Sequence, residues 1–408
     1  MKDHVLKRGI EMQGNPKGCS NFGGSMAAKL EYCRNRAMEL FALYGYRPFS
    51  PAELQLLSGV WDNLPHSEAE KLIALTSPYG EPCVLRGDLT LSAVTYLSTH
   101  FSDEERPLRL SYAERVFSVP KPPKHNLEQN QIGVELIGWE GAGADVELLA
   151  LLFRTLDMLG IDSVIALGDM SVTAKIFSAL PKDVSEILTR HLMNGSYTAY
   201  EKTLESLNLT ADKMTLLSAL PSLRGGVETI DRAAELTDNP ALFEPLKKLC
   251  ASLDSLGYGK RICIDFSFLR ELGYYSGPVF NVYTRKGTLL GGGGRYDGLL
   301  AKLGMDGEAA GFALDLKELA DNCSGSLPLP KLMLWCGASD SAEVLKFAEE
   351  LRSRGISFEL SWNKNREESK SAAHLRKYGI WADFSEKKIY NLNSGREYGF
   401  DAFDWGLL

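Results

Sequence analysis

The sequence lacks the cysteine patterns, apolar runs and leader features that mark several classes of protein. No Cys-x-x-Cys pair or Cys/His cluster occurs, so we expect no zinc site and, from scattered thiols, a reduced cytoplasmic protein. No run of about 18 apolar residues is present, which argues against a transmembrane helix. Residues 1–18 have no long apolar core, so we expect no signal peptide. The seven cysteines are Cys19, Cys33, Cys83, Cys250, Cys263, Cys323 and Cys336.

An excess of basic residues is also absent. The chain has 45 Lys and Arg against 53 Asp and Glu, a net charge of −8, which argues against a general nucleic-acid-binding surface. Hydrophobic residues make up 44% and charged residues 24% of the chain, as in ordinary globular proteins. The length of 408 residues favours two or three domains. We expect neither a metal nor a cofactor.

What the chain does have is a distinctive stretch from Phe268 to Asp297. Two adjacent tyrosines, Tyr274 and Tyr275, precede an apolar run and a polar turn, and a second apolar pair leads into four glycines. This pattern predicts a β-hairpin whose second strand has almost no side chains. Glycine in a strand usually marks close approach of a ligand or of another backbone. We interpret the stretch as one wall of a small-molecule pocket; the alternative is a glycine-rich bulge beside core tyrosines. The expected floor is Gly291, Gly292, Gly293, Gly294 and Arg295.

Several segments before this stretch have clear patterns. Ser25 is positioned to cap a helix that runs to about Tyr44. Residues 109–117 form a predicted strand, and residues 131–137 alternate so that Gln131, Gly133 and Glu135 share one face. A strand that turns Gln and Glu toward a pocket is unusual, and the alternative is a solvated face.

The remaining pattern suggests an insertion and a second domain. Residues 171–257 are helical in pattern with no strand signal, which indicates a helical insertion between strands of a sheet. A boundary falls at residues 324–330, which are rich in Ser, Gly and Pro. Beyond it, residues 331–408 alternate between strand and helix, so we expect a small α/β domain there.

Six motifs occur in a specific order, and together they resemble the histidyl-tRNA synthetase family over roughly residues 15–320. The resemblance implies an α+β fold with a class II aminoacyl-tRNA synthetase-like antiparallel sheet flanked by helices, spanning residues 1–325 and including the insertion at about 171–257. The motifs are RGDLT (86–90), RLSYAERVF (109–117), QIGVELIG (131–138), RELGYYSGPVF (270–280), GGGGRYDGL (291–299) and AGFALDLKEL (310–319).

The resemblance also implies a binding site for L-histidine. In the family, an acidic residue and a Thr hold the α-amino group, a Gln and a Glu line the pocket, an Arg faces the carboxylate and paired Tyr lie beside the imidazole. This division is physically sensible, since an ammonium group favours carboxylates and a carboxylate favours a guanidinium fork. The matching positions are Asp88, Thr90, Gln131, Glu135, Arg270, Tyr274 and Tyr275.

The ATP-binding half of the family's site does not carry over. In the family, the second motif ends in Phe-Arg-x-Glu, and its Arg contacts the α-phosphate. Here Phe117 is followed by Ser118. The third motif supplies an Arg for the γ-phosphate, and here that position is Glu318. A carboxylate repels a triphosphate, so the loss of both arginines predicts no adenylation.

A chain that keeps the amino-acid half of this site and lacks the nucleotide half resembles the family of ATP phosphoribosyltransferase regulatory subunits. That resemblance implies a non-catalytic protein of histidine biosynthesis, with a short-form catalytic subunit as partner and histidine as feedback inhibitor. A homodimer within a hetero-oligomer is expected, and tRNA is not an expected partner. Two alternatives remain: a divergent histidyl-tRNA synthetase, and a free-standing histidine sensor with another partner.

Many members of that family end near the core, whereas this chain continues through residues 331–408. The extension resembles a shortened anticodon-binding domain. It has no basic stripe or aromatic ladder suited to RNA, so we interpret it as a structural or assembly domain.

Overall fold

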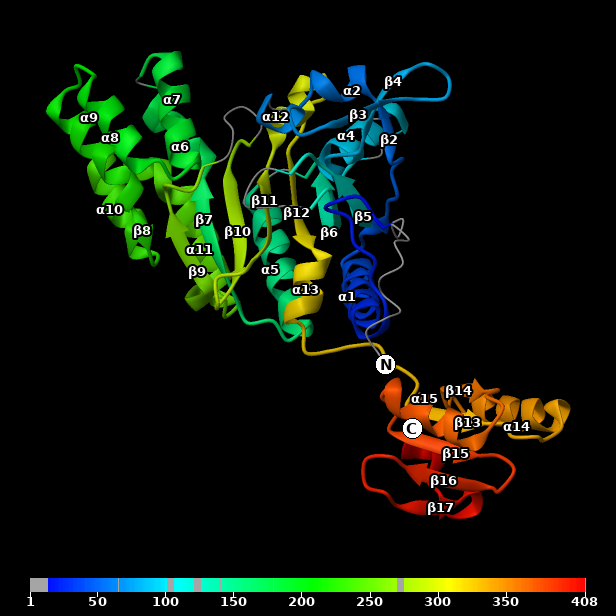
Figure 1. Ribbon diagram of the computed structural model, residues 1–408. Helices are drawn as coiled ribbons and strands as arrows, with labels where there is room; N and C mark the ends of the chain where they lie inside the picture. The colour runs from blue at the N-terminus through cyan, green and yellow to red at the C-terminus, as the bar shows by residue number, and fades with distance from the viewer. Residues whose placement is uncertain are drawn as a thin grey trace. The chain divides into compact units, whose positions relative to one another are not determined.

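The computed structural model describes residues 14–64, 66–100, 106–120, 126–139, 141–178, 180–269 and 275–407. The chain divides into two compact units, Met1–Ser326 and Leu327–Leu408, and each is described by itself (Figure 1). Among the described residues, none of the helices combines the length and the apolar character that a membrane crossing requires.

The first unit is built on a sheet in which β5, β6, β12, β11, β10 and β7 are neighbours in that order and pair antiparallel. Parallel pairs add β1 beside β5 and β9 beside β7, and β8 pairs antiparallel with β9. This confirms the expected mixed fold with a large antiparallel sheet. The strands are β1 (Arg47–Pro48), β5 (Leu108–Phe117), β6 (Glu128–Ile137), β7 (Ser163–Asp169), β8 (Arg224–Gly225), β9 (Ile262–Asp265), β10 (Pro278–Thr284), β11 (Leu289–Arg295) and β12 (Ala309–Asp315).

Helices cover both faces of this sheet. On one face, α1 (Gly24–Leu43), α5 (Ala142–Met158) and α13 (Leu316–Asn322) contact the central strands, and Phe41 of α1 meets Phe312 of β12 edge-on with ring centroids 5.9 Å apart. On the other face, α4 (Leu89–His100) and α12 (Asp297–Lys302) enclose a separate hydrophobic cluster. Figure 1 shows α1, α5 and α13 together beside the central strands.

The start of α1 differs from the sequence expectation. The helix begins at Gly24, its N-cap is Gly23, and no side chain caps it. Ser25 therefore lies inside the first turn and does not cap the helix. The extended conformation of Gly23 and the positive φ of Gly24, 55°, set the entry of the chain instead.

A small sheet of order β2-β4-β3 precedes the motif at 86–90. Its strands pair antiparallel, and β4 leads directly through residues 86–88 into α4. The elements here are β2 (Leu54–Leu56), α2 (Leu57–Trp61), α3 (His66–Ala69), β3 (Ile73–Thr76) and β4 (Pro82–Leu85).

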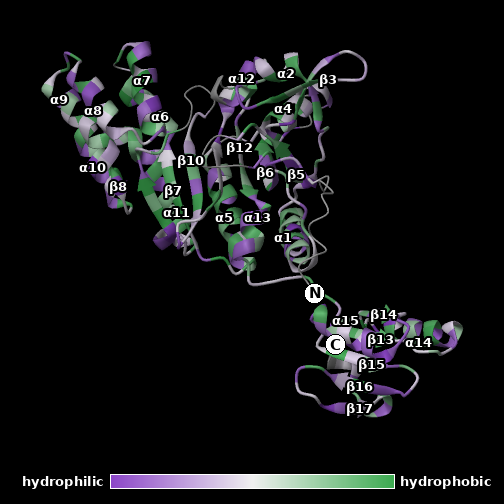
Figure 2. Ribbon diagram, in the orientation of Figure 1, coloured by the Kyte–Doolittle hydropathy of each residue, from purple (hydrophilic) through white to green (hydrophobic). Residues whose placement is uncertain are grey.

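The segment between β7 and β9 is mainly helical, with one exception to the sequence expectation. The expectation of no strand in residues 171–257 is wrong at Arg224–Gly225, which forms β8 at the edge of the sheet. Two residues are too few to carry a hydrophobic period, so the pattern gave no signal. In Figure 2 these helices carry both hydrophobic and hydrophilic residues, as helices with one buried side do. They are α6 (Met170–Phe177), α7 (Lys182–Met193), α8 (Tyr197–Glu205), α9 (Ala211–Ala219), η2 (Leu220–Ser222), α10 (Glu228–Thr237), η3 (Pro240–Phe243), α11 (Glu244–Ser255) and η4 (Gly259–Arg261).

The second unit has a five-stranded sheet of order β14-β13-β15-β16-β17. The central strand β13 pairs parallel with β14 and β15, and the last three strands pair antiparallel. A hydrophobic cluster between the sheet and α14 includes Leu334, Val344 and Phe384. The elements are β13 (Leu332–Trp335), α14 (Ser341–Ser353), β14 (Phe358–Ser361), α15 (Arg366–Leu375), β15 (Ile380–Asp383), β16 (Lys388–Asn391), β17 (Glu397–Gly399), η5 (Phe400–Ala402) and η6 (Trp405–Leu407).

Candidate functional site

The glycine-rich strand β11 lies between β10 and β12, with Gly293 opposite both Phe280 and Phe312. A Cβ on Gly291 would lie 2.1 Å from the carbonyl oxygen of Ala313, and one on Gly293 would lie 2.1 Å from that of Gly311. Side chains at these positions would therefore collide with the neighbouring strand. Close packing of the strands therefore requires glycine at these positions, independently of any ligand.

The strand alternation of β6 divides its residues between the two faces. Ile132, Val134 and Leu136 belong to the cluster beneath α1 and α5, whereas Ile137 belongs to the cluster beneath α4 and α12. Glu135 shares the second face, because successive side chains in a strand point to opposite sides. It is only 1% exposed, so the solvated-face alternative is wrong for this residue.

The carboxylate of Glu135 is the centre of a buried polar cluster. Thr90 Oγ1 donates to its Oε1 at 2.7 Å, and the hydroxyl of Tyr112 donates to the same oxygen at 3.1 Å. The hydroxyl of Tyr296 donates to Oε2 at 2.5 Å. These donors come from α4, from β5 and from the residue that follows β11. The sheet and α4 thus bring three distant parts of the chain to one carboxylate.

Tyr112 and Tyr296 were missed as site residues by sequence reasoning. Both lie within the motifs at 109–117 and 291–299, so the available signal was their position in those motifs. Their contact with Glu135 depends on strand order and register, since Tyr112 pairs with Gly133. A local sequence pattern does not predict which strands are neighbours. Both tyrosines are buried, at 1% and 2% exposed.

Asp88 lies next to this cluster, at the start of α4. Its Oδ1 accepts a hydrogen bond of 2.5 Å from the backbone N–H of Leu91, so the carboxylate caps the helix. Burial raises the pKa of Asp88 to about 6, and the hydrogen bonds from the Leu91 and Thr90 backbone oppose that shift.

Burial also raises the pKa of Glu135 to about 7. The hydrogen bonds from Tyr296, Thr90 and Tyr112 lower it, and the charge of Asp88 raises it. Among the described residues, the three side chains that donate to Glu135 are all neutral. A buried Glu135 with the half-buried Asp88 beside it suits a ligand that brings N–H donors or positive charge.

The other residues that the sequence singled out have different outcomes. Gln131 is half-buried on the same face of β6 as Glu135. Tyr275 is half-buried, packs against both hydrophobic clusters of the first unit and raises the pKa of Tyr112 electrostatically, so it lies near the Glu135 cluster. Arg270 and Tyr274 lie outside the described residues.

Arg295 is engaged by protein groups on the side of α5. Its Nη2 lies 3.0 Å from Oδ2 of Asp145, its Nη1 donates to Glu308, and Nη2 also donates to the carbonyl of Gly141 at 3.3 Å. Asp297 is 3.7 Å away. The guanidinium thus clamps the end of β11 to α5 and to the segment before β12.

The two positions that the sequence assigns to the nucleotide half lie after β5 and in α13. Ser118 follows β5, and its backbone N–H donates to Leu127. Glu318 lies in the first turn of α13, whose N-cap is Asp315. Oδ1 of Asp315 accepts hydrogen bonds from the backbone of Lys317 at 2.8 Å and of Glu318 at 3.2 Å.

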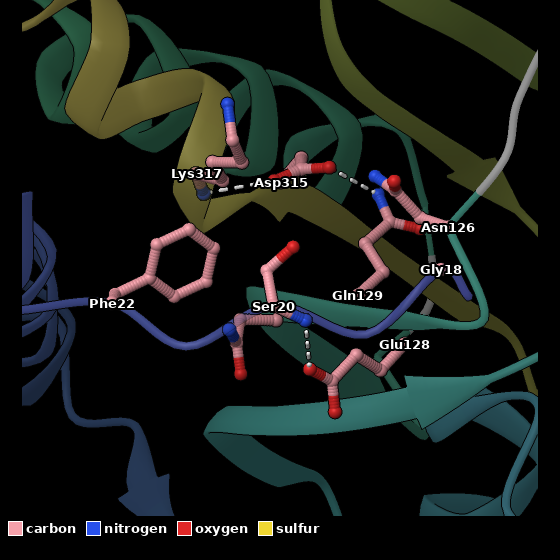
Figure 3. Close-up of a pocket in the computed structure, with 9 residues that line it drawn as sticks. Gly18, Ser20, Phe22, Asn126, Glu128, Gln129, Asp315 and Lys317 are labelled. Carbon is pink, nitrogen blue, oxygen red and sulfur yellow. Dashed lines mark hydrogen bonds between the residues drawn. The ribbon is translucent and has the colours of Figure 1, made fainter. Parts of the chain in front are cut away.

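A small pocket adjoins Asp315 (Figure 3). The side-chain amide of Gln129 donates to Oδ2 of Asp315 at 2.8 Å, and the backbone N–H of Ser20 donates to Glu128 at 3.2 Å. Of the lining residues that the structure describes, Lys317 is the one cation, and its ammonium is paired with Asp321 at 2.5 Å. The lining residues are Gly18, Ser20, Phe22, Asn126, Glu128, Gln129, Asn130, Asp315 and Lys317.

Comparison with known proteins decides the family. The family model for histidyl-tRNA synthetase matches residues 18–319. The ATP phosphoribosyltransferase regulatory subunit of Moorella thermoacetica is 30% identical over 374 residues, which cover 88% of this chain and 95% of that protein. The chain belongs to the ATP phosphoribosyltransferase regulatory subunits, within the histidyl-tRNA synthetase family. The regulatory subunit of Bacillus licheniformis is likewise 30% identical, over 79% of this chain and 84% of its own length.

Solved structures agree with this placement among the regulatory subunits. A Bacillus halodurans structure described as an ATP phosphoribosyltransferase regulatory subunit/histidyl-tRNA synthetase has a TM-score of 0.80 at 26% identity, and the match covers 91% of this chain and 97% of that one. Histidyl-tRNA synthetase from Nostoc sp. has a TM-score of 0.78 at 17% identity, covering 95% and 96%, and shows the shared fold. The resemblance inferred from the ordered motifs is confirmed.

Proposed function

We propose that this protein is a non-catalytic subunit that binds L-histidine at the Glu135 cluster and regulates a separate ATP phosphoribosyltransferase catalytic subunit. In this proposal it activates the catalytic subunit, and bound histidine reduces the activity of the complex. The single observation that carries the proposal is the contrast between the two halves of the site. The amino-acid half keeps the buried Glu135 cluster with the half-buried Asp88 beside it, whereas the nucleotide half has Glu318 and Ser118 where phosphate-binding arginines are expected.

The chemistry of the cluster supports histidine as the ligand. Asp88 and Thr90 are assigned to the α-ammonium group, and Gln131 and Glu135 to the remaining polar contacts. Buried carboxylates favour a cationic or N–H-bearing ligand, because a buried charge without a partner is costly. Tyr275 and Tyr274 are assigned to the imidazole, and Arg270 to the carboxylate.

The nucleotide half supports the absence of adenylation. Transfer of a nucleotidyl group depends on preorganised cations, and loss of one such group typically costs a factor of about a hundred or more in rate. Glu318 and Asp315 place two carboxyl groups at the start of α13, and Lys317 beside them is neutralised by Asp321. An acidic side chain thus stands where the family uses arginine to bind a triphosphate.

The test is to measure histidine binding and both activities with the full-length chain. Calorimetry should detect histidine binding, alone or with the catalytic partner present. ATP–pyrophosphate exchange that depends on histidine should be absent. The partner's activity should require this chain and fall as histidine is added. Histidine-dependent exchange would instead establish a divergent synthetase, and co-purification with an unrelated protein would favour a free-standing sensor.

Assembly is a separate part of the proposal. Class II synthetase-like cores dimerise across their first motif, so we infer a homodimer within a larger hetero-oligomer. Light scattering on the chain alone and with the catalytic subunit should give a dimer and then a larger complex. A monomer under both conditions would contradict this part without affecting the binding site.

A further inference from the structure

The three hydroxyl groups around Glu135 use most of its hydrogen-bonding capacity. A carboxylate can accept about four hydrogen bonds, two on each oxygen. Thr90 and Tyr112 both donate to Oε1, and Tyr296 alone donates to Oε2. Counting donors from the described part of the chain, one acceptor position remains, on Oε2. Because Glu135 is 1% exposed, bulk water does not reach this position freely.

Two glycines make this arrangement sterically possible. A Cβ on Gly311 of β12 would lie 1.9 Å from Oε2 of Glu135, so only glycine leaves room for the carboxylate. A Cβ on Gly133 would lie 2.7 Å from the hydroxyl of Tyr112. The orientation of the carboxylate is thus fixed both by the donors that hold it and by the side chains that are missing next to it.

We propose that Tyr112 and Tyr296 are positioning residues whose hydroxyls orient the Glu135 carboxylate so that one acceptor on Oε2 faces the ligand, and thereby set the affinity and the pH range of histidine binding. This inference rests on the proposed function, because it takes histidine as the ligand of the Glu135 cluster. Neither tyrosine needs to touch the ligand. Each acts by holding the carboxylate.

The pH range follows from which groups face Glu135. Asp88 at the start of α4, Tyr112 from β5 and Tyr296 after β11 all act on its pKa. Tyr275 acts on Tyr112, and Tyr46 is near enough for Glu135 to raise its pKa. The hydrogen bond from Tyr296 is the largest contribution that lowers the pKa of Glu135, against burial, which raises it to about 7.

Removing the Tyr296 hydroxyl should therefore raise the pKa of Glu135 further. If the ionised carboxylate is the form that accepts from the ligand, histidine binding by Tyr296→Phe should need a higher pH than binding by the wild type. Histidine titrates as well, near pH 6.5 for its imidazole. That titration is the same for every variant, so the difference between variants reports Glu135.

The experiment is calorimetry of L-histidine with the full-length protein from pH 5.5 to 8.5. Tyr296→Phe and Tyr112→Phe keep the ring and remove only the hydroxyl. The matched control is Tyr200→Phe, which removes a buried hydroxyl that donates to the Leu217 carbonyl at 2.9 Å in the helical insertion. We expect Tyr296→Phe to weaken binding roughly tenfold at pH 7, as for loss of a hydrogen bond to a charged group, and to recover part of this at pH 8.5. The control should bind as the wild type.

A second measurement does not depend on histidine. The carboxyl carbon of Glu135 can be followed by NMR in protein labelled with 13C-glutamate, and identified as the signal lost in Glu135→Gln. Its titration midpoint should move to higher pH in Tyr296→Phe and stay unchanged in Tyr200→Phe. An unchanged midpoint would overturn the positioning role even if the wild type failed to bind histidine.

The outcomes separate the two proposals. If Glu135→Gln binds histidine as tightly as the wild type, the assignment of the site, and with it the proposed function, is wrong. If Glu135→Gln loses binding but both Tyr→Phe variants keep the wild-type affinity and pH profile, the site stands and the positioning role is wrong. Equal weakening at every pH, with no shift of the midpoint, would mean that the hydroxyls are merely structural.

Discussion

Arg295 and Asp145, which are 150 positions apart in the chain, form an ion pair with Nη2 and Oδ2 separated by 3.0 Å. The two residues are 7% and 8% exposed. Burial raises the pKa of the Asp145 carboxyl, and the charge of Arg295 opposes this shift. The pair fixes the end of β11, one residue before Tyr296, against the start of α5.

The first prediction concerns this pair. Arg295→Met should destabilise the protein by on the order of 3–5 kcal/mol, because it leaves Asp145 as a buried charge without its partner. Urea unfolding measures the loss. Adding Asp145→Asn to the same variant should recover part of it, since the unpaired charge is then gone. If the double variant were as unstable as the sum of both single variants, the pair would not be coupled.

The second prediction is a pH dependence of stability from Glu135. Its pKa is about 7 in the folded protein against an ordinary value of 4.5, so the folded state holds the proton more tightly than the unfolded state. The contribution of the protonated Glu135 carboxyl to the stability of the folded protein is complete below pH 4.5. It is lost as the pH rises through 7. Relative to Glu135→Gln, which does not titrate, the wild type should lose about 3 kcal/mol across this window. Unfolding of both proteins between pH 4.5 and 8 measures this; a constant difference would show that Glu135 keeps its ordinary pKa.

The third prediction tests the space that glycine provides. Gly311→Ala would bring Cβ within 1.9 Å of the Glu135 carboxylate and 2.6 Å of the Val134 carbonyl oxygen. The buried strand cannot yield easily, so we expect a loss of stability of about 1–3 kcal/mol or more, together with weaker histidine binding. Gly143→Ala is the control, because its Cβ has no atom within 4 Å and alanine favours its helix. Thermal unfolding should separate the two variants clearly.

The fourth prediction concerns Arg270, the residue assigned to the ligand's carboxylate. Arg270→Ala should weaken histidine binding roughly tenfold or more while the protein stays folded, because it removes a charge-assisted hydrogen bond. Calorimetry provides the affinity and circular dichroism the fold. Arg285→Ala, which removes a half-exposed side chain paired with Asp162, is the control. Unchanged affinity would mean that Arg270 is misassigned; Arg295 would be a weak replacement, since its guanidinium is already engaged by Asp145 and Glu308.

The fifth prediction concerns the nucleotide half. Restoring both arginines, in Ser118→Arg with Glu318→Arg, should not restore histidine-dependent ATP–pyrophosphate exchange. Asp315 still presents a carboxyl group at the start of α13, and the Gln129 amide is bonded to it. Measurable exchange in the double variant would show that these two positions alone separate this chain from a synthetase.

The sequence by itself determined the family and the fold class, and it predicted the face of β6 that carries Gln131 and Glu135. The order of six motifs is a property of the chain, and the placement of Gln131, Gly133 and Glu135 on one face follows from the local alternation of a strand. The entry of α4 after Asp88 also follows from local pattern, since an acidic residue before a helix caps it.

Only the tertiary structure decided which residues meet. Thr90, Tyr112 and Tyr296 converge on Glu135 because β5, β6, β12 and β11 are neighbours in the sheet. The local spacing of apolar residues does not predict this strand order. The same holds for Arg295 and Asp145, and for β8, whose two residues form a strand only because β9 provides an edge. Local hydrophobic patterns report which side of an element is buried. The burial that raises the pKa of Glu135, and the hydroxyls that lower it, arise only when distant segments pack together.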